Sequence, residues 1–127
     1  MPQHPDQVVG RARALVGCRF RPQGRSAAEG LDCIGLVALA IDVRDVPHDY
    51  ALRGGSSARV EGGLRAAGLR SVDAMAAGDV ILFSPGAGQL HLGIFTGTGL
   101  VHADAGLRRV TERPLPLSWP VLGIWRV

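Results

Sequence analysis

The sequence contains no lysine, and aromatic residues make up only 5% of its 127 residues. All 14 basic residues are therefore arginines, and they are scattered along the chain without a basic run. Surfaces that bind nucleic acids combine clustered basic residues with aromatic side chains. This composition gives little support to a nucleic-acid partner, whereas the net charge of +3 is compatible with approach to an anionic surface.

Long apolar runs are also absent, although hydrophobic residues make up 46% of the chain. None reaches the roughly 18 residues that a membrane-spanning helix needs, so we expect no membrane span. Residues 1–6 lack the basic region and apolar stretch of a secretory signal, and we expect a protein made in the cytoplasm without one. The length predicts one domain over residues 1–127.

Cysteine is scarce, with only Cys18 and Cys33. A disulfide between them is open, but a chain of this size does not need one, and the missing signal favours reduced thiols. The two cysteines could be combined with His91 and His102 as zinc ligands. Structural zinc sites usually contain ligand pairs about two to four residues apart, and none occurs here. We therefore expect no metal and no cofactor.

The stretch around Cys33 carries the strongest local signal. Asp32 is a good helix N-cap, and residues 34–43 are almost all apolar, which predicts a buried helix. Cys33 then lies in the first helical turn, where unpaired amides and the helix dipole favour negative charge. That position favours the thiolate, with a pKa between about 3.5 and 7.5. The alternative is that Cys33 is a small buried hydrophobic residue.

Periodicity and turn residues divide the rest of the chain into helices first and strands afterwards. We expect helices at residues 5–16 and 56–67, a loop at 20–30, a turn at 47–49, and strands at 79–83, 91–96, 100–103, 107–112 and 121–127. Close spacing of the strands implies an antiparallel meander. The predicted class is α+β, with helices on one side of the sheet.

His91 and His102 lie on consecutive predicted strands joined by a glycine-rich turn. Side chains on paired strands come within reach of each other across the ladder. A thiol nucleophile needs a base and a group that orients the base, and these two histidines can supply both for Cys33. A histidine on a strand is otherwise a packing residue. His4, in an expected flexible end, and His48, in a turn, fit no such arrangement.

Asp104 follows His102 closely in the sequence. We expect it to be a turn residue rather than a member of the catalytic group, on the premise that its position on the strand points to the other face. Asp32 is expected to act as a helix cap.

Four local patterns resemble the NlpC/p60 family of papain-like cell-wall cysteine peptidases, in the family's order and spacing. They are Gly17-Cys18-Arg19-Phe20, Asp32-Cys33-Ile34-Gly35-Leu36-Val37, Gly78-Asp79-Val80-Ile81-Leu82-Phe83, and His91-Leu92-Gly93-Ile94 with Val101-His102-Ala103. The resemblance implies a papain-like fold in which N-terminal helices pack on a C-terminal antiparallel sheet of five to six strands.

The resemblance also implies roles and a substrate. Cys33 corresponds to the nucleophile, His91 to the base and His102 to the orienting residue. The family cuts an amide bond in the peptide stem of peptidoglycan, usually between D-glutamate and a diamino acid.

Substrate contacts are expected in the loop before Cys33. Phe20 stands where the family usually has a tyrosine at the oxyanion or substrate site, and Asp32 is assigned to the same region. Arg19, Arg21 or Arg25 could meet substrate carboxylates, because guanidinium groups pair well with them. Each of these arginines could instead be a solvated surface residue.

A finer resemblance is to the short phage-tail and gene-transfer-agent members, whose C-terminal segments are apolar and contain tryptophan, as residues 115–127 do here. It implies carriage in a tail or baseplate, docking on baseplate proteins through the C-terminus, and action on the cell wall in the periplasm. Phe20 motivates a second hypothesis, a structural tail subunit with weak or no catalysis. A third is an amidase or acyltransferase of the wider papain-like group.

Overall fold

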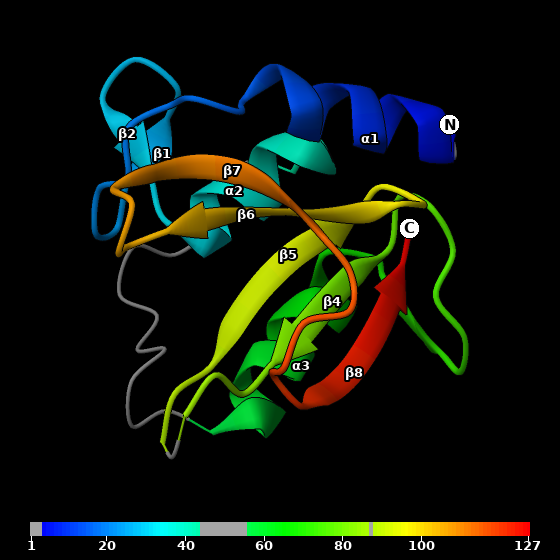
Figure 1. Ribbon diagram of the computed structural model, residues 1–127. Coiled ribbons are helices and arrows are strands. Elements are labelled where there is room, and N and C mark those ends of the chain that lie inside the picture. Colours follow the sequence, from blue (N-terminus) through cyan, green and yellow to red (C-terminus); the bar gives the residue numbers. More distant parts are fainter. Residues whose placement is uncertain (1–3, 44–55, 87) are drawn as a thin grey trace.

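The structure, a computed structural model, describes residues 4–43, 56–86 and 88–127 (Figure 1). In chain order its elements are α1 (Pro5–Ala14), β1 (Arg25–Ser26), β2 (Gly30–Leu31), α2 (Cys33–Ala40), α3 (Ser57–Ala66), β3 (Arg70–Val72), β4 (Val80–Phe83), β5 (His91–Phe95), β6 (Gly99–Asp104), β7 (Arg109–Pro114) and β8 (Val121–Arg126). None of the described helices is both long and apolar enough to cross a membrane.

The main sheet has six strands in the described part of the chain, in the order β3-β8-β4-β5-β6-β7, and all its pairings are antiparallel. Strands β4 to β7 follow one another as the predicted meander. The C-terminal strand β8 then returns to lie between β4 and β3. The predicted α+β class and the sheet of five to six strands are confirmed.

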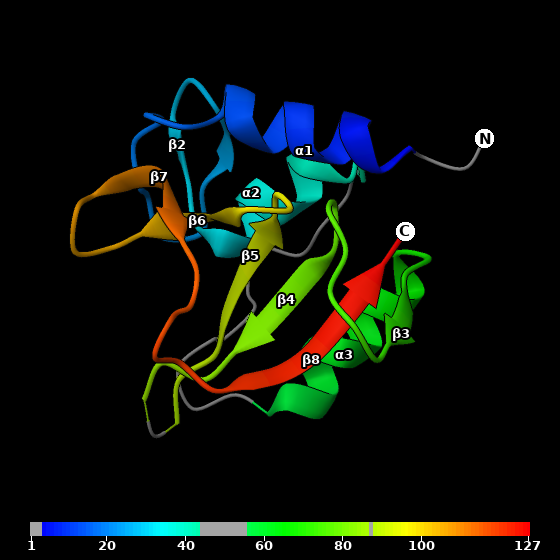
Figure 2. The same cartoon turned by 45° about the vertical axis from the view of Figure 1, so that its right-hand side comes forward.

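The helices cover one face of this sheet (Figure 2), which confirms the predicted layering. α1 and α2 contact each other and β5, and α3 lies behind β3 and β8. The main core forms between helices and sheet and includes Leu36, Ile94 and Trp125, each at most 1% exposed. On the opposite face, the segment between β7 and β8 packs on Ile81 and Phe83.

α2 is the buried helix that the sequence predicts. All its residues except Leu39 are buried, and the Asp32 side chain caps it by accepting a hydrogen bond from the Gly35 amide at 2.8 Å. Gly35 is needed for a close approach, because a Cβ there would lie 2.1 Å from the Gly24 carbonyl oxygen. This contact seats the loop before Cys33 against the start of the helix.

Several local features differ from the expectation. The predicted loop at residues 20–30 contains the short β1-β2 hairpin, and β3 was not predicted. His4, expected in a flexible end, caps α1, because its Nδ1 accepts from the Asp6 amide. The predicted turn at residues 47–49, including His48, lies outside the described residues.

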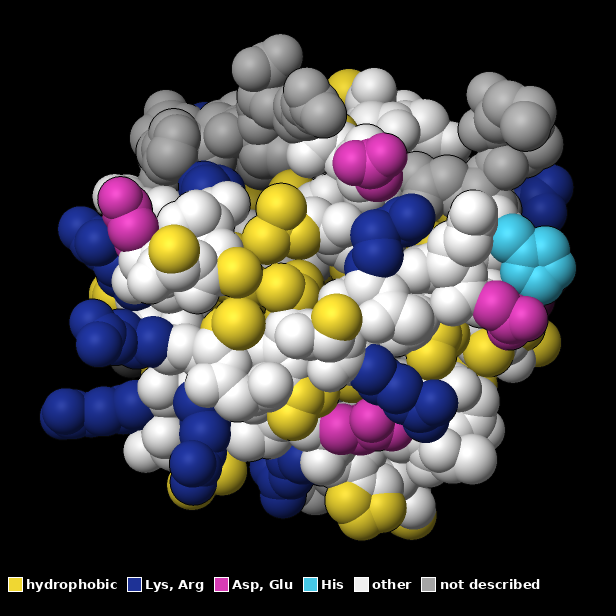
Figure 3. Space-filling model, turned by 90° about the horizontal axis from the view of Figure 1, so that it is seen from above, with side chains coloured by type: hydrophobic (Ala, Val, Ile, Leu, Met, Phe, Trp, Pro, Cys, Tyr) yellow, Lys and Arg dark blue, Asp and Glu magenta, His cyan; other side chains and the backbone are white. Residues whose placement is uncertain are grey.

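The face that carries α1 has no single basic patch among the side chains visible on it (Figure 3). Arginine side chains stand along the left and lower edge of the view, others lie nearer its middle beside acidic side chains, and apolar side chains lie between them. The distribution agrees with the scattered arginines of the sequence.

Candidate active site

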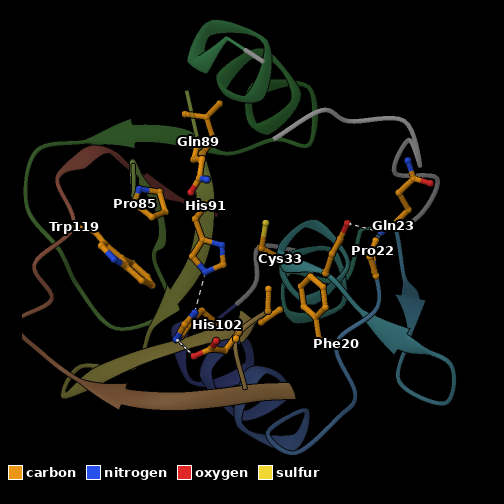
Figure 4. A pocket seen from close by; sticks show the side chains of 15 residues that line it. Phe20, Pro22, Gln23, Cys33, Pro85, Gln89, His91, His102 and Trp119 are labelled. Atoms are coloured by element: carbon orange, nitrogen blue, oxygen red, sulfur yellow. Dashed lines mark hydrogen bonds and ion pairs between the residues drawn. The ribbon is translucent and has the colours of Figure 1, made fainter. Parts of the chain in front are cut away.

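Cys33, His91 and His102 line one pocket, of about 440 Å³, between the start of α2 and strands β5 and β6 (Figure 4). Each comes from a different element: Cys33 is the first residue of α2, His91 opens β5 and His102 lies within β6. The structure therefore brings together the three residues that the sequence pattern proposes as a catalytic group.

The two histidines are joined by a short hydrogen bond between His91 Nε2 and His102 Nδ1, at 2.9 Å. Their ring planes are nearly perpendicular, and the Trp119 ring packs edge-on against both, with centroids 5.5 Å away. Because Nε2 of His91 is occupied in this way, Nδ1 is the nitrogen left for another partner. In Figure 4 it lies on the side of the ring that faces Cys33.

Cys33 is 2% exposed, and the backbone groups of Leu92 and of Cys33 itself favour the thiolate and lower the pKa of its thiol only in part. Burial raises its pKa to about 12, and the charge of the adjacent Asp32 acts in the same direction. The expectation of a lowered pKa is wrong for this structure. Desolvation of the thiolate at a buried helix start outweighs the helix-start amides and dipole on which the sequence argument relied.

The His91 imidazole is also held neutral. Burial lowers its pKa to about 4, and the neighbouring His102 contributes in the same direction, while Asp104 opposes the shift. Burial likewise lowers the pKa of His102. The favoured resting state is therefore a neutral thiol beside a neutral histidine pair, rather than a thiolate–imidazolium pair.

Asp32 and Phe20 both line the pocket, and Phe20 lies on the side opposite Trp119. The Asp32 carboxylate accepts from the Arg25 guanidinium at 2.8 Å and from the Gln23 amide at 3.0 Å, in addition to capping α2. Its charge is thus paired inside the protein. This arrangement fixes the loop before Cys33 and confirms Asp32 as a cap.

The predicted arginine contacts lie away from this pocket. Arg19 and Arg21 are exposed and are not among the described residues that line it. Arg19 forms a backbone bridge with Arg109, and Arg21 lies 3.7 Å from Glu29. Arg25 is not a lining residue either, but its guanidinium donates to Asp32, which is.

Sequence reasoning gave no site role to Asp104 or Trp119, which both line the pocket. Asp104 is the last residue of β6, and its Oδ2 lies 4.0 Å from His102 Nε2. The prediction that it faces the other side is wrong, because residues two apart on a strand share a face. Trp119 comes from the segment between β7 and β8, and only the tertiary fold places it at the histidine pair.

Cys18 and Cys33 are both free, so the open possibility of a disulfide is not realised. Within residues 4–43, 56–86 and 88–127, no group of three or more histidine, cysteine or acidic side chains is arranged to hold a metal ion. Cys18 is half-buried, while Cys33 is buried in the pocket wall.

Stability should depend on pH because His91 is buried in its neutral form. Its pKa is about 4 in the folded protein and about 6.5 when unfolded, so protonation favours the unfolded state. The free energy of unfolding should be undiminished above pH 6.5 and fall by about 3 kcal/mol as the pH drops to 4. Urea unfolding of the native protein and His91→Gln across this range isolates the effect. Equal pH dependence in both proteins would contradict it.

No protein-family model matches the sequence, and no curated protein matches it. Solved structures do. NlpC1 from Trichomonas vaginalis superposes with a TM-score of 0.71 at 18% identity, covering 97% of this chain and 45% of that protein. The NlpC/p60 domain of the peptidoglycan hydrolase SagA gives 0.61 at 22% identity, covering 88% of this chain and 90% of that domain.

RipD from Mycobacterium tuberculosis, described as a non-catalytic NlpC/p60 domain protein adapted to peptidoglycan binding, gives 0.62 at 18% identity and covers 100% of this chain and 99% of RipD. These likenesses show that the chain has the NlpC/P60 fold, shared with peptidoglycan hydrolases and with a non-catalytic protein. The chain spans less than half of the T. vaginalis protein.

Proposed function

We propose that this chain, which has the NlpC/P60 fold, is a cysteine peptidase that hydrolyses an amide bond in the peptide stem of peptidoglycan. The bond we expect is the one between D-glutamate and the diamino acid. The observation that carries the proposal is the meeting of Cys33, His91 and His102 in one pocket, with the two histidines 2.9 Å apart.

The charge states of the site favour proton transfer during attack rather than before it. The Cys33 Sγ bonds to the carbonyl carbon while its proton passes to His91 Nδ1. His91 then donates that proton to the departing amine as the C–N bond breaks, which leaves an acyl-enzyme. A water molecule, deprotonated by His91, attacks the thioester, and the Cys33 thiol leaves with the proton.

Negative charge on the carbonyl oxygen needs donors at the start of α2. The Cys33 amide is the expected one, because the first amides of a helix have no partner within it. Phe20, in the pocket wall, has no hydroxyl to add a second donor. The loss of one such donor lowers a rate by about 10²–10³.

We further propose that the enzyme is carried in a phage-like tail or gene-transfer-agent baseplate and acts on the cell wall in the periplasm. Its support is the resemblance of the C-terminal segment to such proteins. Both tryptophans of that segment have roles within the domain, because Trp125 is buried in the core and Trp119 lines the pocket. The apolar residues it leaves for baseplate proteins are the exposed Val121 and Leu122.

A second candidate function is a peptidoglycan-binding tail subunit that does not cleave. The pKa of about 12 for the Cys33 thiol favours it, because little thiolate forms at neutral pH. Phe20 favours the binding function as well, because it lacks the hydroxyl of the tyrosine that the family usually has there. RipD has the same fold and is described as non-catalytic.

Digestion of purified sacculi tests the two functions against each other. We expect the native protein to release soluble stem peptides, detected by mass spectrometry, and Cys33→Ala to release none. The mass of the new termini identifies the bond. Cys18→Ala is the matched control, because it removes the other free thiol; its release should equal that of the native protein.

Equal release by the native protein and Cys33→Ala would refute the peptidase proposal. If neither releases peptides but both sediment with sacculi, the binding function is supported instead.

A further inference from the structure

Asp104 lies beside His102 and lines the same pocket as Cys33 and His91. Its side chain is 18% exposed, and its Oδ2 lies 4.0 Å from His102 Nε2. Its Oδ1 accepts a hydrogen bond from the Leu107 amide at 3.0 Å. The turn after β6 therefore holds the carboxylate with one oxygen directed at the histidine.

The hydrogen bond between His91 and His102 can exist with its proton on either ring. A neutral imidazole has one N–H and one bare nitrogen. If His91 Nε2 donates, His91 Nδ1 is bare and can accept the Cys33 proton, and His102 must have its N–H at Nε2. If His102 Nδ1 donates instead, His91 has its N–H at Nδ1 and cannot act as a base toward Cys33.

The carboxylate distinguishes these two arrangements. In the first, the His102 Nε2–H dipole points toward a negative charge, which is favourable. In the second, a nitrogen lone pair faces that charge, which is unfavourable. Thr111 Oγ1, 3.5 Å from His102 Nε2, does not discriminate, because a hydroxyl can donate or accept.

The basic groups around the carboxylate do not replace it. Arg109 is the cross-strand neighbour of Asp104 on β7, and the charge of Arg113 also reaches His102. Neither side chain can accept a hydrogen bond, so neither can favour an N–H at His102 Nε2. Among the described groups at this ring edge, only the carboxylate selects the first arrangement.

We propose that Asp104 is a positioning residue that fixes the tautomers of both histidines, with N–H at Nε2 of His102 and at Nε2 of His91. It leaves His91 Nδ1 bare and directed toward Cys33. The inference rests on the proposed function, because the tautomer matters for hydrolysis only if Cys33 gives its proton to His91.

Nitrogen NMR of histidine-labelled protein tests the proposal without a substrate. At pH 7 the native protein should show a bare Nδ1 on His91 and a protonated Nε2 on His102. Asp104→Asn keeps an oxygen for the Leu107 amide but removes the charge, and should move a measurable fraction of both rings to the opposite tautomers. Asp73→Asn removes an exposed carboxylate beyond the far edge strand β3, and should leave the spectrum unchanged.

A protonated Nδ1 on His91 in the native protein overturns the proposal, whether or not the variant folds. Unchanged tautomers in a folded Asp104→Asn protein overturn it as well. On the stem peptide, the variant should lose between about 10- and 10⁴-fold in kcat with little change in KM. A native protein that cleaves nothing but has the expected tautomers refutes the peptidase function and leaves the assignment of Asp104 standing. Unchanged tautomers in Asp104→Asn, together with cleavage by the native protein, refute the assignment of Asp104 and leave the peptidase function standing.

Discussion

Asp79→Ala is expected to lower the free energy of unfolding by about 1–3 kcal/mol, the usual cost of removing one partner from partly buried hydrogen bonds. Asp79 is fully buried, and both of its carboxylate oxygens bind the Arg126 guanidinium, at 2.8 and 2.9 Å. One of them also accepts from the Ala76 amide at 2.8 Å. Alanine would leave that amide and the guanidinium without these acceptors.

The location of this pair makes the loss important for the site. Asp79 directly precedes β4, and Arg126 ends β8. The ion pair therefore links the C-terminal strand β8 to β4, which is the neighbour of β5. The Phe95 amide donates to the Asp79 carbonyl, which ties the same turn to the end of the strand that begins at His91. Urea unfolding monitored by circular dichroism measures the change.

Arg13→Ala provides the control, because it removes an arginine from a much more exposed pair with Glu112. Exposed pairs contribute little to stability. An Asp79→Ala protein no less stable than Arg13→Ala would show that the pair of Asp79 with the partly exposed Arg126 is dispensable.

The parts of the fold that could be predicted from sequence have strong local signals. Residues 34–43 are almost all apolar, which fits a buried helix, and Asp32 supplies the cap. The strands from β4 to β6 follow from short apolar runs separated by glycine-containing turns. His91 and His102 were predicted to meet because consecutive antiparallel strands place their side chains side by side.

The parts that could not be predicted depend on long-range contacts. β3 has three residues, and it is a strand only because β8 returns from the C-terminus to pair with it. The C-terminal apolar segment was interpreted as a docking tail, whereas Trp125 belongs to the core. Trp119 reaches the histidine pair by the same return of the chain.

The charge state of Cys33 was predicted wrongly for a different reason. A helix start favours a thiolate only when the surroundings also solvate it, and burial depends on what packs over the helix. At Cys33 the sequence signals pointed to both a buried helix and an ionised thiol, although burial disfavours ionisation. The structure resolves that conflict in favour of the neutral thiol.

His91→Gln is expected to lower the rate of stem-peptide hydrolysis by about 10²–10⁴, the usual contribution of a general base. Glutamine can keep a hydrogen bond to His102 but cannot accept the Cys33 proton. His4→Asn is the control: it removes another imidazole, keeps an N-cap side chain for α1, and should leave the rate unchanged. Equal rates for His91→Gln and the native protein would refute the assigned role.

The pH profile of kcat/KM then separates the neutral pair from a thiolate–imidazolium pair. With a pKa of about 4 for His91 and about 12 for Cys33, the neutral pair predicts a rate that falls only as the pH drops through 4. Toward high pH the neutral pair predicts a flat profile up to 10. An ion pair would instead lose activity on the alkaline side, because the imidazolium that protonates the leaving amine would give up its proton. A decline between pH 8 and 10, with circular dichroism unchanged, would therefore show that substrate binding or motion of the site restores the ion pair that burial disfavours in this structure.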